Sequence, residues 1–426
     1  MSLALASRRA AISPAWVKNP LWRTARAVPS LDLQFADTKS LADAVTGQSL
    51  VTFTRASSGT YVGSDGLIKT AATDEPRFDH NPTTGESLGL LVEESRSNLL
   101  LYSNDLDNAW WVKSNSTLTS NAIAAPDGTV TAEKFIPDNG ATTLASVVST
   151  NITKAASAIS YVFSFFVKAG GFSTFLVRAR DSANNANRIE NVFNLSTFAV
   201  SGLVTTGTFT NRTFTYQDFG NGWYRCALGF TTGTETSINV RIAGTAAETG
   251  DGTSGIYLWG AQLEAGAFPT SYIPTTTATA TRSADVATDT TRGAALRSLF
   301  AQFRSPASGT RPIVSLDDNS ANNRIELFTS GADPKLLITS GGSAQADLDA
   351  GSVTANTMTR LAGRFAADNF AVSVSGGNEI TDISGSSPAV DRIRIGRDQA
   401  GNYLSGTIAR ITGWDVPLNV LPEVTQ

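Results

Sequence analysis

Four segments with a period of two constrain the fold of this chain more than any other feature. In residues 161–167 every second side chain is apolar, and residues 175–180, 224–230 and 238–242 alternate in the same way. Successive side chains of a strand point to opposite faces, so each segment has one face for a core and one for solvent or a ligand. Many such segments, separated by turns and without a long helical pattern, predict an all-β fold of tandem antiparallel β-sandwiches, or jelly rolls.

The chain has 426 residues, which is too long for one ordinary domain. Asp65-Gly66 predicts a hairpin turn between two strands, and a Thr/Ala/Ser/Asp-rich stretch after Pro274 predicts a linker. The expected order is an extended basic arm over residues 1–30, a small turn-rich β module over 31–98, a jelly roll over 99–275, a linker over 276–292 and a second β-sandwich over 293–426.

The first 30 residues combine positive charge with tryptophan. Five cations precede the first acid, Asp32, and apolar anchors lie among them. Disordered tails are usually poor in tryptophan, so we expect an arm that docks on a partner, with a disordered basic tail as the alternative. The residues expected to carry the attachment are Arg8, Arg9, Trp16, Trp22 and Arg23.

A single histidine, His80, and a single cysteine, Cys226, narrow the possible chemistry. They exclude an internal disulfide, a thiolate metal cluster and a multi-histidine metal site. His80 lies in a predicted turn, and Cys226 lies on the inward side of its strand, as a small buried residue would. The adjacent carboxylates Glu93 and Glu94 are poorly placed to face one substrate, and no other catalytic pair stands out. We therefore expect no enzyme, no metal site and no cofactor.

The charge content and hydropathy of the chain favour an extracellular or viral all-β protein and argue against nucleic-acid binding and membrane insertion. Charged residues make up 16% of the chain, against about a quarter in typical domains. Such neutral, polar sequences are common in extracellular and viral all-β proteins. The net charge of −4 gives no indication of nucleic-acid binding, and no apolar run is long enough to insert into a membrane.

Residues 53–102 contain a string that neither composition nor periodicity explains. Its parts are Phe53-Thr54-Arg55-Ala56-Ser57-Ser58-Gly59-Thr60-Tyr61-Val62, Pro76-Arg77-Phe78-Asp79 and Gly89-Leu90-Leu91-Val92-Glu93-Glu94-Ser95-Arg96-Ser97-Asn98-Leu99-Leu100. This string resembles a recurrent segment of tailed-bacteriophage virion proteins, found in fibre, spike and capsid-associated subunits. The resemblance implies an assembly part with a binding surface, located in the virion.

Two further likenesses concern the domains. Landmarks of carbohydrate-module jelly rolls are resembled by four segments, residues 98–100, Trp110-Trp111, 222–225 and 256–264. Laminin-G-like and concanavalin-A-like sandwiches are resembled by three segments nearer the C-terminus, residues 360–365, 392–397 and 404–414. Many relatives of the first kind hold a structural calcium with an Asp pair in the last strand. Trp259 to Gln262 occupy that stretch here, and Glu264 is the one carboxylate left to contribute an oxygen ligand.

The alternation also predicts a candidate carbohydrate site on the outward face of the jelly roll. Sugar recognition uses an aromatic face together with planar hydrogen-bonding groups. The residues expected to share this face are Arg178, Arg180, Trp223, Arg225 and Arg241. The alternative is a solvated face, or one buried against a neighbouring domain or subunit. Trp110 and Trp111 must point to opposite sides of a strand, so one of them belongs to the core.

These observations favour a structural component of a phage virion, a tail fibre, a spike or a head decoration. It would be anchored by its arm and would display β-sandwiches that bind host surface glycans. The alternatives are a cement protein without a ligand, or a polysaccharide-degrading enzyme. We expect other virion proteins as partners and a homo-oligomer, with a trimer favoured because closed symmetry is the rule for homo-oligomers.

Overall fold

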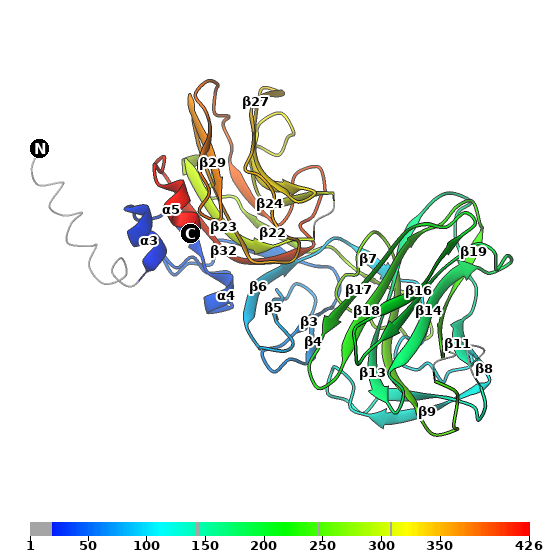
Figure 1. Cartoon of the computed structure of the whole chain (residues 1–426). Coiled ribbons are helices and arrows are strands. Elements are labelled where there is room, and N and C mark those ends of the chain that lie inside the picture. Colours follow the sequence, from blue (N-terminus) through cyan, green and yellow to red (C-terminus); the bar gives the residue numbers. More distant parts are fainter. Residues whose placement is uncertain (1–18, 142–144, 246–247, 307–308) are drawn as a thin grey trace, which may run out of the picture.

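The computed structural model describes residues 19–141, 145–245, 248–306 and 309–426. Two β-sandwiches lie side by side in this part of the chain (Figure 1). The prediction of an all-β fold with tandem antiparallel sandwiches is confirmed. Arg8, Arg9 and Trp16 lie outside the described residues.

The central sandwich contains two antiparallel sheets formed entirely by residues 111–265. The strand order of the first sheet is β17 (Thr210–Asp218), β18 (Tyr224–Thr231), β13 (Ser160–Gly170), β20 (Gly255–Ala265), β10 (Ala132–Pro137) and β9 (Ser116–Ile123). The order of the second is β16 (Val200–Thr206), β15 (Arg188–Asn194), β14 (Thr174–Asp181), β19 (Ser237–Ala243), β11 (Ser146–Ser149) and β8 (Trp111–Ser114), with β12 (Ile152–Thr153) also on β19.

The other sandwich draws its strands from both ends of the chain, and we call it the composite sandwich. One sheet has the order β30 (Ile380–Asp382), β29 (Asn369–Val374), β28 (Thr359–Ala366), β23 (Ser298–Arg304), β32 (Gly406–Trp414), β6 (Ser87–Val92) and β5 (Phe78–His80), with β1 (Leu31–Leu33) also on β32. The other has the order β2 (Thr52–Thr54), β22 (Val286–Asp289), β31 (Arg392–Ile395), β24 (Thr310–Asp317), β25 (Arg324–Ser330), β26 (Asp333–Ser340) and β27 (Ser343–Asp349).

The central sandwich is therefore an insertion into the composite sandwich. The chain enters it through β7 (Arg96–Asn98) and leaves it through β21 (Ala280–Arg282), and these two strands pair with each other. This differs from the division expected from the sequence. Residues 31–98 are no separate module, because β1, β2, β5 and β6 complete the composite sheets, and the expected linker over 276–292 contains β21 and β22.

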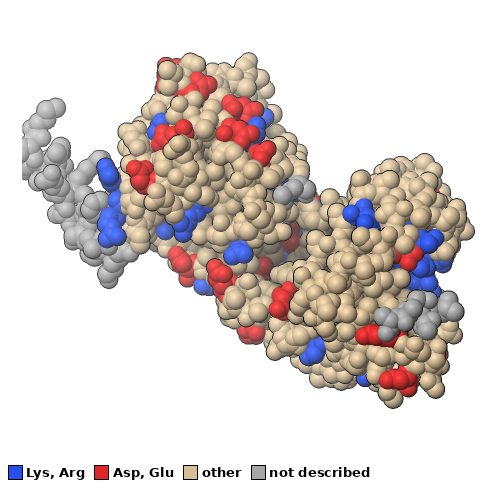
Figure 2. All heavy atoms as spheres, viewed as in Figure 1, with Lys and Arg blue, Asp and Glu red and all other residues tan. Residues whose placement is uncertain are grey.

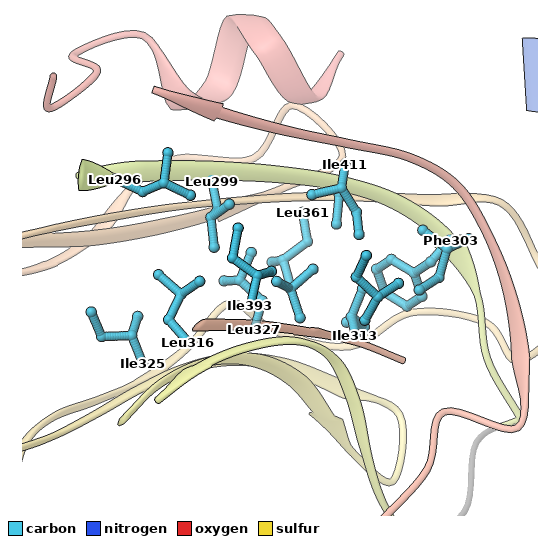
Figure 3. Close-up of a cluster of buried hydrophobic side chains, with 14 of the residues drawn as sticks. Leu296, Leu299, Phe303, Ile313, Leu316, Ile325, Leu327, Leu361, Ile393 and Ile411 are labelled. Atoms are coloured by element: carbon cyan, nitrogen blue, oxygen red, sulfur yellow. The ribbon is translucent and has the colours of Figure 1, made fainter. Parts of the chain in front are cut away.

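Apolar side chains of the two composite sheets face each other and fill one core (Figure 3). Leu299 and Ile411 come from one sheet, whereas Ile313, Leu327 and Ile393 come from the other. The N-terminal segment contributes the buried residues Leu31, Leu33, Phe35, Val51, Phe53, Leu90 and Val92 to the same core. A fragment that lacks this segment would leave the core open.

A short hairpin lies between the two sandwiches. It comprises β3 (Gly59–Val62) and β4 (Ile68–Ala71), and the turn predicted at Asp65-Gly66 joins them. Val62 and Ile68 pack with Phe166, Trp223 and other apolar residues on the outer face of the first central sheet. Strand β13 is consequently buried on both faces, which explains why Val162 and Phe166, on its outer face, are apolar as well.

The segment expected to be an extended arm folds back onto the composite sandwich where it is described. It includes the helix α3 (Pro20–Ala25), which packs near the C-terminal helix α5 (Leu421–Thr425). Two other short helices, α4 (Phe35–Thr38) and η1 (Gly293–Ala295), lie outside this segment. Trp22 is 5% exposed, and its indole N–H donates to Asp32 Oδ2 at 2.9 Å. Trp22 was expected to carry attachment to a partner but is buried within its own chain, whereas Arg23 is exposed.

Candidate functional site

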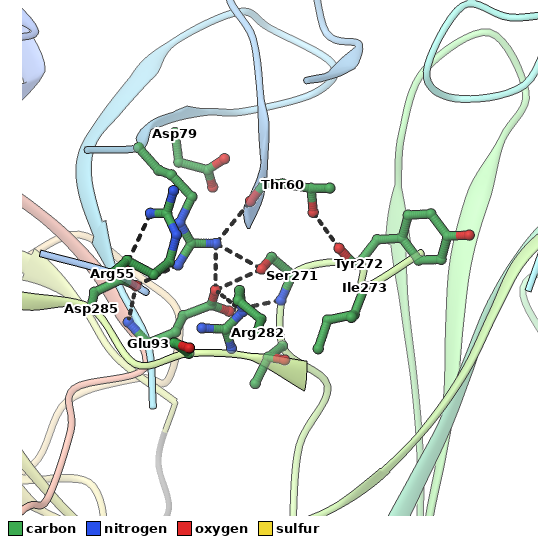
Figure 4. Close-up of polar contacts among 12 residues, drawn as sticks. Arg55, Thr60, Asp79, Glu93, Ser271, Tyr272, Ile273, Arg282 and Asp285 are labelled. Carbon is green, nitrogen blue, oxygen red and sulfur yellow. Dashed lines mark hydrogen bonds and ion pairs between the residues drawn. The ribbon is translucent and has the colours of Figure 1, made fainter. Parts of the chain in front are cut away.

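An ion cluster lies at the junction of the two sandwiches (Figure 4). It contains three guanidiniums and two carboxylates, each at most 5% exposed. The members are Arg55, Arg77, Glu93, Arg282 and Asp285. Asp285 Oδ1 lies 3.1 Å from Arg55 Nη1, and Asp285 also pairs with Arg77. Glu93 Oε2 lies 2.8 Å from Arg77 Nη1 and 3.4 Å from Arg282 Nε.

The charges of this cluster depend on one another because burial opposes each of them. Burial alone would raise the pKa of Glu93, but the guanidiniums of Arg282 and Arg77 and two hydrogen bonds from Ser271 lower it to about 2. Burial also favours a lower pKa for Arg77, but its carboxylate partners Asp285 and Glu93 raise it. A buried pair of this kind is costly to break, since removal of one partner leaves an uncompensated charge in the interior.

Beside the ion cluster, an interdomain cleft of about 570 Å³ opens between the sandwiches. Figure 2 shows the recess where the two lobes meet. The outer face of the first central sheet is one wall, whereas Arg304, Asn356 and residues 405–407 of the composite sandwich form the facing wall. The hairpin and the loop over 267–272 close the end near the ion cluster.

Strand register fixes the wall on the central sandwich. Thr213 lies opposite Gly229, Thr215 opposite Ala227, and Gln217 opposite Arg225. The two hydroxyls and the amide of β17 are exposed, whereas the small residues of β18 keep the surface shallow. The result is a polar shelf along an edge strand.

Polar atoms without a partner point to an occupant of this cleft. Four lining residues each have a buried nitrogen or oxygen that forms no hydrogen bond within the described chain. They are Arg225 Nε, Arg304 Nε, Ser405 Oγ and Thr407 Oγ1. Buried polar groups in proteins are nearly always hydrogen-bonded, so a set of orphans along one cleft favours a polar ligand or ordered water.

Two carboxylates line the cleft among the residues that the structure describes. Burial raises the pKa of Asp79 to about 7; the Val62 N–H bond opposes this rise and the charge of Glu93 adds to it. Glu93 accepts hydrogen bonds from Ser271 N and Ser271 Oγ, both at 2.7 Å, in addition to its ion pairs. Both oxygens of Glu93 are thus occupied within the protein.

The five residues predicted to share a carbohydrate-binding face do not lie together. Arg225 lines the interdomain cleft. Trp223 is 4% exposed, belongs to the apolar cluster under the hairpin and donates its indole N–H to Ala124 O at 3.2 Å. Arg178, Arg180 and Arg241 lie on β14 and β19, in the other sheet of the sandwich. The expected stacking platform at Trp223 is wrong, because the hairpin covers that face.

Strand alternation correctly predicted which side chains point into the central sandwich and which point outward, but it did not predict the sheet to which each strand belongs. Phe163, Phe165 and Cys226 are buried in the central core as expected, and burial raises the pKa of the Cys226 thiol. Of the tryptophan pair, Trp111 is buried in the core and Trp110 is half-buried. The shelf residues Thr213, Thr215 and Gln217 were missed, although their alternation with Arg212, Phe214 and Tyr216 was present in the sequence.

The described residues contain neither a cluster of metal-ligating side chains nor a membrane-spanning helix. No group of three or more His, Cys, Asp or Glu residues is placed to hold a metal ion within the described ranges. Glu264, the residue considered as a calcium ligand, is buried and accepts hydrogen bonds from the backbone and hydroxyl of Thr270. In the same part of the chain, no helix has the length and apolar character needed to cross a membrane.

Comparison with known proteins gives distant structural likenesses only. No protein-family model matches the chain, and no curated protein matches its sequence. The carbohydrate-binding module CBM40 of a Ruminococcus gnavus sialidase, solved with α2,3 sialyllactose, shares 16% identity at a TM-score of 0.26 over 30% of this chain and 83% of that one. A Trypanosoma rangeli sialidase solved with sialic acid shares 12% identity at a TM-score of 0.26, over 69% of this chain and 59% of that one. Mouse laminin α1 domains LG4-5 share 10% identity at a TM-score of 0.20, over 57% of this chain and 79% of that one.

Likenesses of this size carry no argument about ligand, activity or family. The description of the chain as two antiparallel β-sandwiches rests on its own strand pairing. Any function has to be argued from the cleft, the charged faces and the sequence itself.

Proposed function

We propose that this protein is a structural component of a phage virion that binds host surface glycans in the interdomain cleft. The string over residues 53–102 supports a place in a tail fibre, a spike or a head decoration. The observation that carries the glycan part is the set of unpartnered polar atoms on the cleft walls, from Arg225, Arg304, Ser405 and Thr407.

The chemistry of these walls suits a hydroxyl-rich ligand. A guanidinium Nε can only donate a hydrogen bond, whereas a serine or threonine hydroxyl can donate or accept. Sugar hydroxyls do both, so one ring can satisfy groups of both kinds. The cleft volume of about 570 Å³ also falls in the range of roughly 300–1,000 Å³ that is common for ligand pockets.

The cleft is proposed to bind without cutting. Hydrolysis of a glycosidic bond needs two available carboxyl groups on either side of the bond. Asp79 has a raised pKa that would suit a general acid. Its neighbour Glu93 is held by Ser271, Arg77 and Arg282, and cannot act as a base or nucleophile without breaking the ion cluster. A polysaccharide-degrading enzyme is therefore the weaker candidate.

A bulky substitution on the shelf tests the glycan site. Thr215→Trp places an indole in the cleft from an exposed position, and Thr119→Trp on β9 of the same sheet is the matched control outside it. Binding to a glycan array and to host cells is expected to fall at least tenfold for Thr215→Trp and to stay unchanged for Thr119→Trp. Equal binding by both variants would remove the cleft from consideration, and an absence of any glycan binding by the unmodified protein would favour a cement protein.

Attachment and assembly are proposed to depend on residues 1–18. Trp22 is already buried in its own chain, so the docking residues that remain are Arg8, Arg9 and Trp16, together with the exposed Arg23. Deletion of residues 1–18 is expected to leave both sandwiches folded and to abolish incorporation into virions.

Light scattering of the full chain is expected to give a homo-oligomer, with a trimer favoured, and a monomer at micromolar concentration would contradict this.

A further inference from the structure

Four arginines lie on neighbouring strands of the second central sheet, on its outer face and away from the cleft. Arg178 on β14 lies opposite Glu190 on β15 and Arg241 on β19, and Arg180 lies opposite Arg188. Neighbouring strands are about 4.8 Å apart, so the guanidiniums form a compact array. We call Arg178, Arg180, Arg188 and Arg241 the arginine face. Figure 2 shows basic side chains gathered on the side of the central sandwich that carries β14 and β19.

Local carboxylates leave part of this positive charge uncompensated. Glu190 pairs with Arg178 Nη2 at 2.9 Å and also with Arg188, so both of its oxygens are occupied. Within the described chain Arg180 and Arg241 form no ion pair. Arg180 donates to amide oxygens of Asn239 and Asn185, and Arg241 donates to Ser146 Oγ at 2.7 Å.

The array is electrostatically unfavourable as it stands. Burial and the neighbouring guanidinium of Arg178 lower the pKa of Arg180 and of Arg241; the charge of Asp181 opposes this for Arg180, and the charge of Glu190 opposes it for Arg241. Arg178 Nε and Arg241 Nε are buried without a hydrogen-bond partner in the described chain. Four half-buried cations, of which only Arg178 and Arg188 have an ion-pair partner in the described chain, would be stabilised by a bound anion.

The same face offers apolar contacts on both sides of the charges. The row across the strands runs from Val204 through Glu190, Arg178 and Arg241 to Val148 and Val112. Val112 is 52% exposed. A carboxylate pairs with a guanidinium through two parallel hydrogen bonds, and the C–H face of a sugar ring packs on apolar side chains. A row of charge flanked by valines is complementary to an acidic sugar.

We propose that the arginine face binds the carboxylate groups of an acidic polysaccharide. Nucleic acid is the less suitable occupant for two reasons. Tight binding of nucleic acid uses many phosphate contacts, whereas this face has two arginines without a carboxylate, and the chain as a whole carries a net charge of −4. The inference extends the proposed glycan-binding function to a ligand class, but it rests on different residues from the cleft, so either site can fail alone.

The test uses polygalacturonate oligomers and the same oligomers with methyl-esterified carboxylates as the uncharged probe. The full-length protein is expected to bind polygalacturonate, to lose at least tenfold in affinity as salt rises from 50 to 500 mM, and to ignore the methyl ester. The double variant R180Q/R241Q is expected to bind at least tenfold more weakly. R324Q, on β25 of the composite sandwich, is the matched control, and Thr215→Trp should leave this binding unchanged.

Each outcome decides the question. Equal binding of the acid and its methyl ester, or equal binding by R180Q/R241Q and R324Q, would overturn the proposal, and so would tighter binding of duplex DNA at the same salt. If the double variant does not fold, the comparison of acid with ester on the unmodified protein still gives the answer. Loss of polygalacturonate binding in Thr215→Trp would place the acidic ligand in the cleft and not on the arginine face.

Discussion

Replacement of Asp285 by Asn tests whether the ion cluster holds the two sandwiches together. Asp285 is fully buried, lies 3.1 Å from Arg55 Nη1, pairs with Arg77 and accepts the backbone N–H of Glu93 at 2.9 Å. Asn keeps the shape and one acceptor oxygen but removes the charge. Three buried guanidiniums would then face one carboxylate, Glu93.

The expected loss in the free energy of unfolding is about 3–5 kcal/mol, the usual cost of removing one partner of a buried ion pair. The matched control is Asp347→Asn on β27, because Asp347 is 56% exposed and lies 3.5 Å from Lys335. That substitution is expected to leave the unfolding curve unchanged, since exposed pairs contribute little.

Urea unfolding followed by circular dichroism and by tryptophan fluorescence measures both variants. The cluster links the entry and exit strands of the inserted sandwich, so Asp285→Asn is also expected to separate the unfolding of the two sandwiches into two transitions. A loss below about 1 kcal/mol, or an effect equal to that of Asp347→Asn, would show that charge compensation at the junction does not stabilise the fold.

Gly59→Ala is expected to cost about 1–3 kcal/mol in urea unfolding, because an added Cβ would lie 3.1 to 3.3 Å from three arginine side chains of the ion cluster; a neutral result would mean that the cluster shifts freely. Residues 99–275 are expected to fold alone, whereas residues 293–426 are not, and dispersed proton NMR signals from the second fragment would contradict the composite sandwich. Burial raises the pKa of Asp79 to about 7, against about 4 in the unfolded chain, so the stability associated with its protonated carboxyl is present below about pH 4 and is lost as pH rises to 7. Asp79→Asn is therefore expected to stabilise the protein by about 1–3 kcal/mol at pH 8 and not at pH 4. Thermal melts measure this effect, with the exposed Asp415→Asn as the control.

Local features of the fold could be predicted from the sequence. Alternation placed Phe163 and Phe165 inside the central sandwich, and Asp65-Gly66 marked a real hairpin turn. These signals depend only on neighbouring residues, because strand periodicity and turn geometry are local properties. The partner of each strand is not local, so Arg178 and Arg225 were both recognised as outward but not as members of opposite sheets.

The division into domains failed for a related reason. Residues 276–292 have few apolar side chains, and a sequence of this kind usually predicts a linker. In the structure β21 and β22 form part of this segment, and Asp285 and Asp289 are fully buried. Burial of a polar residue that has an ion pair or a hydrogen bond gives no apolar signal, so composition alone could not reveal these strands.

The string over residues 53–102 gains a physical explanation from the ion cluster. Arg55 and Arg77 of this string pair with Asp285, and the backbone N–H of Glu93 donates to it, whereas Gly59 lies against the arginine side chains. The contact joins positions that are 230 residues apart in the chain. The string therefore specifies the junction where one β-sandwich is inserted into another. Residues of the string, Asp79 and Glu93 among them, line one end of the cleft. The polar residues of β17, the four cleft residues with unpartnered polar atoms and the arginine face lie outside the string. Chains that resemble this one in the string are therefore expected to share the junction and to differ in their ligands.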